Sequence, residues 1–95
     1  MGFKFEWDPV KAAENFANHH VHFSEGTTVF DDPLSLTIPD PEHSWDEHRF
    51  VTIGESAQGR LLIVVYTDRD GRIRPISVRT ATPRERRTYE EEDQH

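Results

Sequence analysis

The sequence predicts an α+β fold in which an antiparallel β-meander carries helices on one side, with the element order β-α-α-β-β-β-β-α. Four segments rich in β-branched and aliphatic residues follow one another between residues 34 and 80, separated by turns. Two segments with helical start signals precede these strands, and a third follows them. A chain of 95 residues has room for one core, so we expect a single domain over residues 1–95 with a frayed acidic tail at 90–95.

The N-terminal third predicts one strand and two helices. Residues 3–7 alternate apolar and charged side chains, which is the period of a half-buried strand. Asp8 and Pro9 are a typical N-cap and first-turn residue for a helix that ends near residues 19–20. The apolar residues at helical spacing predict its buried side: Val10, Ala13, Phe16 and Ala17. The polar residues left on its other faces are Lys11, Glu14, Asn15 and Asn18. A second cap, Ser24, predicts a short helix over residues 25–30.

Period and turn signals predict the strands of the meander. Residues 34–38 alternate apolar and polar side chains, and residues 49–54 form the next strand. Residues 61–66 are continuously apolar, as expected of a central strand that is buried on both faces. Asp70-Gly71 then predicts a hairpin turn into the last strand.

The last strand, residues 72–80, contains Pro75, which cannot donate a hydrogen bond to a neighbouring strand. We therefore predict a one-residue bulge at Pro75. The bulge is expected to turn three aliphatic residues inward: Ile73, Ile76 and Val78. It is expected to turn the polar residues outward: Arg72, Arg74, Ser77 and Arg79. Thr82, Pro83 and Glu85 then predict a final helix that opens with a capping box and runs to about residue 91.

The basic residues are strongly clustered although the net charge is −7. Nine of the eleven are arginines between residues 49 and 87, where no lysine occurs. The arginine fork binds phosphate and carboxylate oxygens bidentately, so the cluster suits a phosphate-binding surface or an ion-paired sheet. The acidic total argues against nucleic-acid binding over the whole surface and favours a local contact.

Composition excludes several other classes. The chain has no cysteine, which excludes disulfides and thiolate metal sites. It has no signal-like start and no apolar run near the ~18 residues of a membrane span, so we expect a cytoplasmic protein with no membrane contact.

An ordered set of motifs extends along nearly the whole chain: KFEWDPVKAAENFANHHVHF, EGTTVFDDP, EHRFVTIG, GRLLIVVYT and RIRPISVRTATPRERRTYEE. This set resembles the BrnT family of type II toxin-antitoxin toxins. Two departures from the family pattern stand out. Residues 18–21 read Asn-His-His-Val where Lys-His-Gly-Val is common, and Pro75 and Thr80 replace an aliphatic residue and a frequent arginine.

The resemblance implies a RelE-like fold and a ribonuclease that inhibits translation by cleaving RNA without a cofactor. It also implies neutralisation by BrnA, a ribbon-helix-helix antitoxin, in a heterotetramer that reaches operator DNA only through the antitoxin. The runner-up is a module that binds the antitoxin as a corepressor with weak or no catalysis. A metal-dependent hydrolase, suggested only by the number of histidines, is a third reading.

Metal-free RNA cleavage needs a base, an acid and cations that stabilise the phosphorane. We expect Arg79 to be the main phosphate clamp, assisted by Arg49 and by Arg74 or Arg86. The alternative is structural, because Arg79 and Arg49 could instead pair with Glu47 or Glu85.

Glu47 is the candidate base and would share a face with Arg49 if both residues are extended, although a solvated carboxylate is an equal alternative. His43 and His48 are candidate acids. His19 is a third, because it matches the position of the family's histidine. Lys11 and Tyr89 resemble the lysine and tyrosine that RelE-type toxins use on their substrate, and Tyr89 could alternatively serve packing.

The histidine-rich segments around residues 19–22 and 40–48 do not match a known metal-ligand spacing, so no metal site is expected. Trp45 lies in a polar loop and could stack on a base or on an antitoxin side chain.

Overall fold

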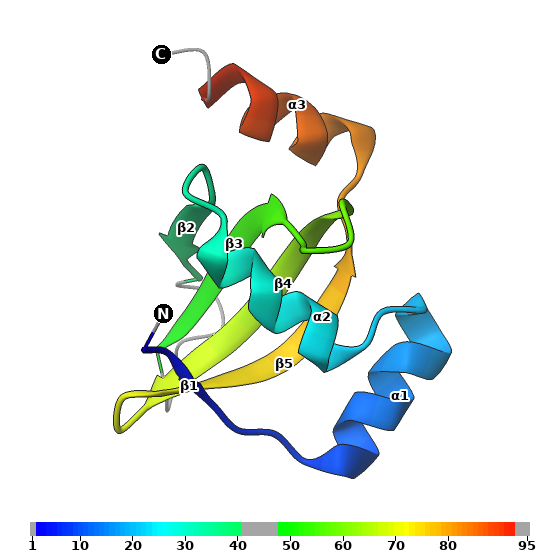
Figure 1. Cartoon of the computed structure of the whole chain (residues 1–95), viewed down its shortest axis with the longest axis vertical. Coiled ribbons are helices and arrows are strands. Elements are labelled where there is room, and N and C mark those ends of the chain that lie inside the picture. The colour runs from blue at the N-terminus through cyan, green and yellow to red at the C-terminus, as the bar shows by residue number, and fades with distance from the viewer. Residues whose placement is uncertain (1, 41–47, 93–95) are drawn as a thin grey trace.

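The computed structural model describes residues 2–40 and 48–92 (Figure 1). The predicted α+β class is confirmed, including its helix count and element order. The elements are β1 (Lys4–Phe5), α1 (Pro9–His19), α2 (Phe23–Thr27), the 3₁₀ turn η1 (Thr28–Asp31), β2 (Leu36–Pro39), β3 (Arg49–Glu55), β4 (Leu61–Arg69), β5 (Arg72–Thr80) and α3 (Pro83–Glu92). No helix within the described ranges is long and apolar enough to cross a membrane.

The strands form one five-stranded sheet in the order β1-β5-β4-β3-β2. Strands β2 to β5 are the predicted antiparallel meander, and β4 lies at its centre with its first four residues buried. The short strand β1 joins the other edge in parallel with β5, so the sheet is mixed. Phe5 lies opposite Ile73 and brings the N-terminal aromatic residues against the core.

One face of the sheet is covered by α2 and η1. The hydrophobic core lies between this face and the two helical segments. The cluster contains Val21, Phe23, Val29, Leu62, Val64, Tyr66, Ile73 and Val78. Gly26 of α2 packs closely on Val78, and a Cβ atom at this glycine would lie 2.7 Å from Val78 Cγ2. The close approach of the helix to β5 therefore requires glycine at this position.

The predicted bulge is present beside Pro75. Tyr66 lies opposite Pro75 and Val65 lies opposite Ser77, so Ile76 is the extra residue without a direct partner. The expectation that Ile76 points into the core is wrong: Pro75 is buried with Ile73, and Ile76 is only half-buried. The extra residue follows Pro75, so Pro75 still points to the same side of the sheet as Ile73. The alternation of side chains is interrupted one residue later, at Ile76.

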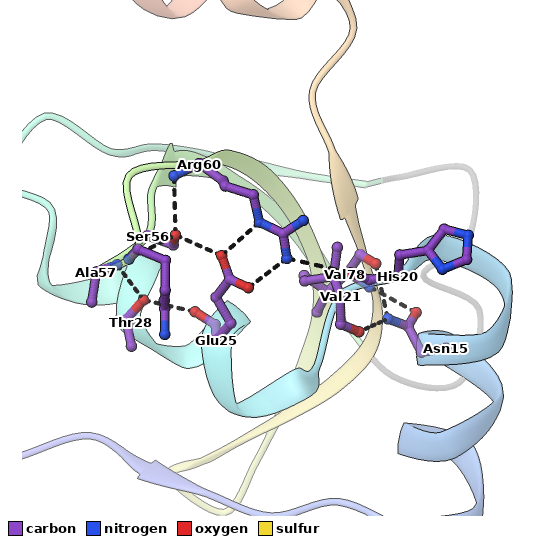
Figure 2. Close-up of polar contacts among 10 residues, drawn as sticks. Asn15, His20, Val21, Glu25, Thr28, Ser56, Ala57, Arg60 and Val78 are labelled. Atoms are coloured by element: carbon purple, nitrogen blue, oxygen red, sulfur yellow. Dashed lines mark hydrogen bonds and ion pairs between the residues drawn. The ribbon is translucent and has the colours of Figure 1, made fainter.

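The predicted inner side of α1 is also wrong. Val10 is 63% exposed and Phe16 is 41% exposed, whereas Asn15 is 6% exposed. The Asn15 side chain donates to the carbonyl oxygens of Val21 and Val78 at 3.0 and 2.9 Å, and it accepts from the Val78 N–H at 3.0 Å (Figure 2). Beyond β1 the edge of β5 needs hydrogen-bond partners, and the Asn15 amide supplies them as a neighbouring strand would.

A second polar network ties α2 to the turn between β3 and β4. Both oxygens of the Glu25 carboxylate accept from Arg60, and Ser56 donates to one of them at 2.8 Å (Figure 2). The hydrogen bonds from Arg60, with help from Ser56, hold the pKa of Glu25 below its usual range although burial opposes this. Arg60 is therefore committed to the fold and is unavailable for phosphate binding.

Candidate functional site

Five arginines project from the sheet face opposite the core, which we call the arginine face: Arg49, Arg69, Arg72, Arg74 and Arg79. Directly paired residues on neighbouring strands project to the same side of a sheet. The register gives three such rows across β3, β4 and β5: Arg49–Thr67–Arg74, Val51–Val65–Ser77 and Ile53–Ile63–Arg79. Arg74, Ser77 and Arg79 thus share one face, as predicted from a bulge at this point of the strand, and Arg49 joins them from β3.

Arg79 is held by α3. Its Nη1 and Nη2 atoms donate to the two carboxylate oxygens of Glu85, both at 2.8 Å. The Glu85 carboxylate also accepts from the Thr82 N–H, and Thr82 Oγ1 accepts from the Glu85 N–H, which completes the predicted capping box. The structural alternative for Arg79, an ion pair with Glu85, is therefore what the isolated chain adopts.

The Arg79–Glu85 pair makes the attachment of α3 sensitive to acid. Hydrogen bonding to Arg79, against the opposing effect of burial, lowers the pKa of Glu85 from 4.5 to about 2 and raises that of Arg79. Because the pKa of Glu85 is depressed in the folded state, its stabilisation is present above pH 4.5 and is lost as the pH falls towards 2. We expect Glu85→Gln to lower the free energy of unfolding at pH 7 by an amount that shrinks by pH 3.

Urea unfolding of wild type and Glu85→Gln at both pH values measures this difference, and Glu91→Gln on the same helix is the control. A difference that stays the same at pH 7 and pH 3 would show that the pair does not form in solution.

Arg49 and Arg74 flank Thr67, which is buried, at the other end of the arginine face. Both residues are half-buried. Arg74 makes no hydrogen bond or ion pair through its side chain within the described ranges, whereas Arg49 has further interactions. The structure thus leaves Arg74 available for an anionic ligand, with Arg49 across the same row.

Lys11 and His19 lie together in a hollow between α1 and the bulge. The hollow has a volume of about 210 Å³ and is lined by Lys11, Glu14, Asn15, Asn18, His19, Ile76 and Ser77. Its β5 wall is Ile76-Ser77, which falls between Arg74 and Arg79 in the strand. The polar side of α1, turned towards β5 by Asn15, therefore brings two of the predicted residues to the edge of the arginine face.

The remaining candidates have different positions. Tyr89 of α3 donates its hydroxyl to Asp32 Oδ2 at 2.6 Å, so this hydroxyl is engaged in holding α3 to the turn before β2. Arg86 is exposed on α3, and His48 is exposed just before β3. Glu47, His43 and Trp45 lie outside the described residues. In residues 2–40 and 48–92, no three His, Asp or Glu side chains gather as a metal site would require.

An apolar groove runs between α3 and the β2–β3 side of the sheet. It has a volume of about 190 Å³, and its floor is formed by Leu36, Ile38, Val51, Ile53 and Ile63. Glu85 and Thr88 of α3 form its polar rim. Since Ile63 lies in the same row as Arg79, the groove and the arginines belong to one continuous face.

The sequence of the chain matches a known protein family. A family model described as "Ribonuclease toxin, BrnT, of type II toxin-antitoxin system" matches residues 7–85. The chain belongs to the BrnT family. It is therefore a ribonuclease toxin of a type II toxin-antitoxin system, with RNA as substrate and an antitoxin as partner.

A solved structure shares the fold of this BrnT family member. The crystal structure of the Brucella abortus ribonuclease toxin BrnT is similar with a TM-score of 0.66 and 23% sequence identity, over 84% of this chain and 97% of that one. No curated protein sequence matches the chain significantly.

Sequence reasoning placed Ser77 on this face with Arg74 and Arg79, but it missed the apolar groove that lies beside them. Alternation along residues 49–53 places Val51 and Ile53 on the side of Arg49. Residues 61–66 are all apolar, so the sequence does not show which of them, Ile63 included, point to that side.

Proposed function

We propose that this BrnT toxin cleaves RNA without a metal ion, on the arginine face, and thereby inhibits translation. The carrying observation is the placement of Arg49, Arg74 and Arg79 on one sheet face, with Lys11 and His19 at its β5 edge. Such a surface offers several cations to consecutive phosphates while the rest of the chain stays acidic.

In the proposed reaction the ribose 2′-oxygen attacks the adjacent phosphorus and the bond to the 5′-oxygen breaks. The products are a 2′,3′-cyclic phosphate and a 5′-hydroxyl end. A base takes the proton of the 2′-hydroxyl, and an acid gives one to the leaving oxygen. Arg79 stabilises the charge on the phosphorane, assisted by Arg49 and by Arg74 or Arg86. Glu47 is the proposed base, and His19 or His43 the proposed acid.

Access to Arg79 requires that the phosphate replace the Glu85 carboxylate. Both ligands present paired oxygens to the guanidinium group, so the exchange conserves the geometry of the contact. None of the described residues of α3 is buried, and this helix is attached through polar contacts of Glu85 and Tyr89. Movement of α3 therefore exposes little core. Lys11 and Tyr89 are the proposed further contacts to the substrate.

The proposed partner is a BrnA-type ribbon-helix-helix antitoxin, assembled with the toxin as a heterotetramer that contacts operator DNA through the antitoxin. A second candidate function is an antitoxin-binding corepressor with weak or no catalysis. The observation that favours it is the occupied state of Arg79 in the isolated chain.

Metal independence has a direct test. Because arginines fill the role of a cation in the proposed reaction, excess EDTA should leave the rate of RNA cleavage by the purified toxin unchanged. A metal-dependent nuclease, stopped in the same buffer, is the control. Cleavage that ceases in EDTA and returns with a divalent cation would exclude the proposed mechanism, and RNA left whole in both buffers would favour the corepressor.

A further inference from the structure

The groove between α3 and the β2–β3 side of the sheet is an apolar surface that the proposed RNA chemistry does not use. Four of its five floor residues are half-buried or exposed, and Ile38 is 61% exposed. Its volume of about 190 Å³ exceeds the roughly 150 Å³ of apolar cavities that accept benzene, so an aliphatic side chain of a partner fits it.

The chemistry of the floor suits a protein better than RNA. Single-stranded RNA is held by bases stacked on aromatic rings or arginine planes, and the floor contains only leucine, isoleucine and valine. Aliphatic side chains from a peptide gain free energy when they leave water for such a surface, at about 25 cal/mol for each Å² of apolar area.

The charges around the groove define the partner further. Arg49 and Val51 point to the same side of β3, and Arg74 lies across the sheet in the row of Arg49. Arg79 already accepts a carboxylate partner in Glu85, which shows that this face accommodates an acidic side chain. A segment with aliphatic residues followed by a carboxylate would complement both the floor and the arginine row.

We propose that this groove is the docking site of the antitoxin, which inserts an aliphatic side chain between α3 and β2 and places an acidic residue near Arg74. The inference rests on the antitoxin partner that family membership supplies. A segment docked there lies across the face proposed for RNA, so the antitoxin neutralises the toxin by covering the arginines.

A second exposed aliphatic residue lies on α1 and provides a matched control. Val10 is 63% exposed, and helical spacing turns it away from Asn15, which faces β5. Ile38→Asp and Val10→Asp therefore make the same kind of change at two equally exposed aliphatic positions. A further variant, Thr88→Arg, narrows the groove from the α3 side at an exposed position without adding negative charge.

The experiment measures the affinity of each variant for the purified cognate antitoxin, in the absence of RNA, together with thermal unfolding and RNA cleavage by the variant alone. Ile38→Asp and Thr88→Arg should each raise the Kd for the antitoxin about tenfold or more, as loss of a central interface contact does. Val10→Asp should bind like wild type, and the melting temperature of all three should stay close to wild type.

Wild-type affinity of both groove variants would overturn the inference. So would a loss of affinity in Val10→Asp alone, which would place the antitoxin on α1. A change in the oligomeric state of the toxin by Ile38→Asp, with antitoxin affinity unchanged, would instead assign the groove to a second copy of the chain. If the wild-type toxin leaves RNA whole, the proposed reaction fails, but the affinities still decide this inference.

Discussion

Replacing Arg79 by alanine should lower the rate of RNA cleavage by about a hundredfold or more, the usual effect of removing one group that stabilises transition-state charge. The same substitution should abolish growth inhibition when the toxin is expressed without its antitoxin. The protein should remain folded, because Arg79 lies on the surface of β5 and its partner Glu85 is itself partly exposed. Cleavage of a synthetic RNA by the purified variant, with circular dichroism as a check on folding, measures both.

The control is Arg87→Ala, which removes the same charge from the side of α3 turned away from Glu85, Thr88 and Tyr89 by helical spacing. This variant should cleave RNA within about threefold of wild type, as expected for a distant surface charge. Unaltered cleavage or toxicity in Arg79→Ala would remove Arg79 from the site. Equal losses in both variants would show that overall charge, rather than the position of Arg79, governs activity.

Replacing Asn15 by leucine should be the most damaging change to the fold. The leucine leaves three buried backbone groups without their partners: the carbonyl oxygens of Val21 and Val78 and the N–H of Val78. A buried polar group that loses its partner costs about 1–3 kcal/mol, so we expect a loss of about 3 kcal/mol or more in the free energy of unfolding. Urea denaturation followed by circular dichroism gives this quantity.

Asn18→Leu is the matched control, because it makes the same substitution on the exposed surface of the same helix. It should change the free energy of unfolding by less than about 0.5 kcal/mol. If Asn15→Leu were no more destabilising than Asn18→Leu, the Asn15 amide would not be holding α1 to β5.

The contrast between α1 and β4 shows what the sequence could predict. The continuous apolar run of residues 61–66 marks the central strand, because only a strand buried on both faces needs it. In α1, by contrast, the spacing of the apolar residues predicted the wrong buried side. The helix approaches the sheet at the edge of β5, where unpaired backbone groups must be satisfied, so Asn15 turns inward and Val10 turns outward. The spacing of apolar residues in α1 cannot predict this orientation, because the backbone groups that need partners belong to β5 and not to the helix.

The arrangement of the arginines was predictable for a different reason. Proline cannot donate to a neighbouring strand, so Pro75 indicated the bulge that aligns Arg74 with Arg79, and the register confirms it. The sequence left open whether Arg79 pairs with Glu47 or with Glu85. The pairing depends on how α3 leaves the end of β5, and the Thr82–Glu85 capping box fixes that exit and aims Glu85 at the arginine.

The C-cap residue of α1, His20, has left-handed backbone. This residue ends α1 with φ of 60° and ψ of 31°, a conformation that glycine adopts without strain, and its N–H donates to the carbonyl oxygen of Phe16 at 2.8 Å. Histidine is among the residues that tolerate this region best after glycine, together with asparagine and aspartate. The cap therefore forms despite the missing glycine, and α1 keeps the position that brings Lys11 and His19 to the bulge.

The central claim, that this chain cleaves RNA by attack of the 2′-hydroxyl at an arginine-lined sheet face, is tested most directly by the ends of the RNA products. Purified toxin, freed from antitoxin and supplied with EDTA, should cut a synthetic RNA into fragments that carry a 2′,3′-cyclic phosphate on one end and a 5′-hydroxyl on the other. The same RNA with 2′-deoxyribose at the cut position should stay whole. Fragments with a 5′-phosphate, or cleavage of the deoxy-substituted strand, would contradict the account.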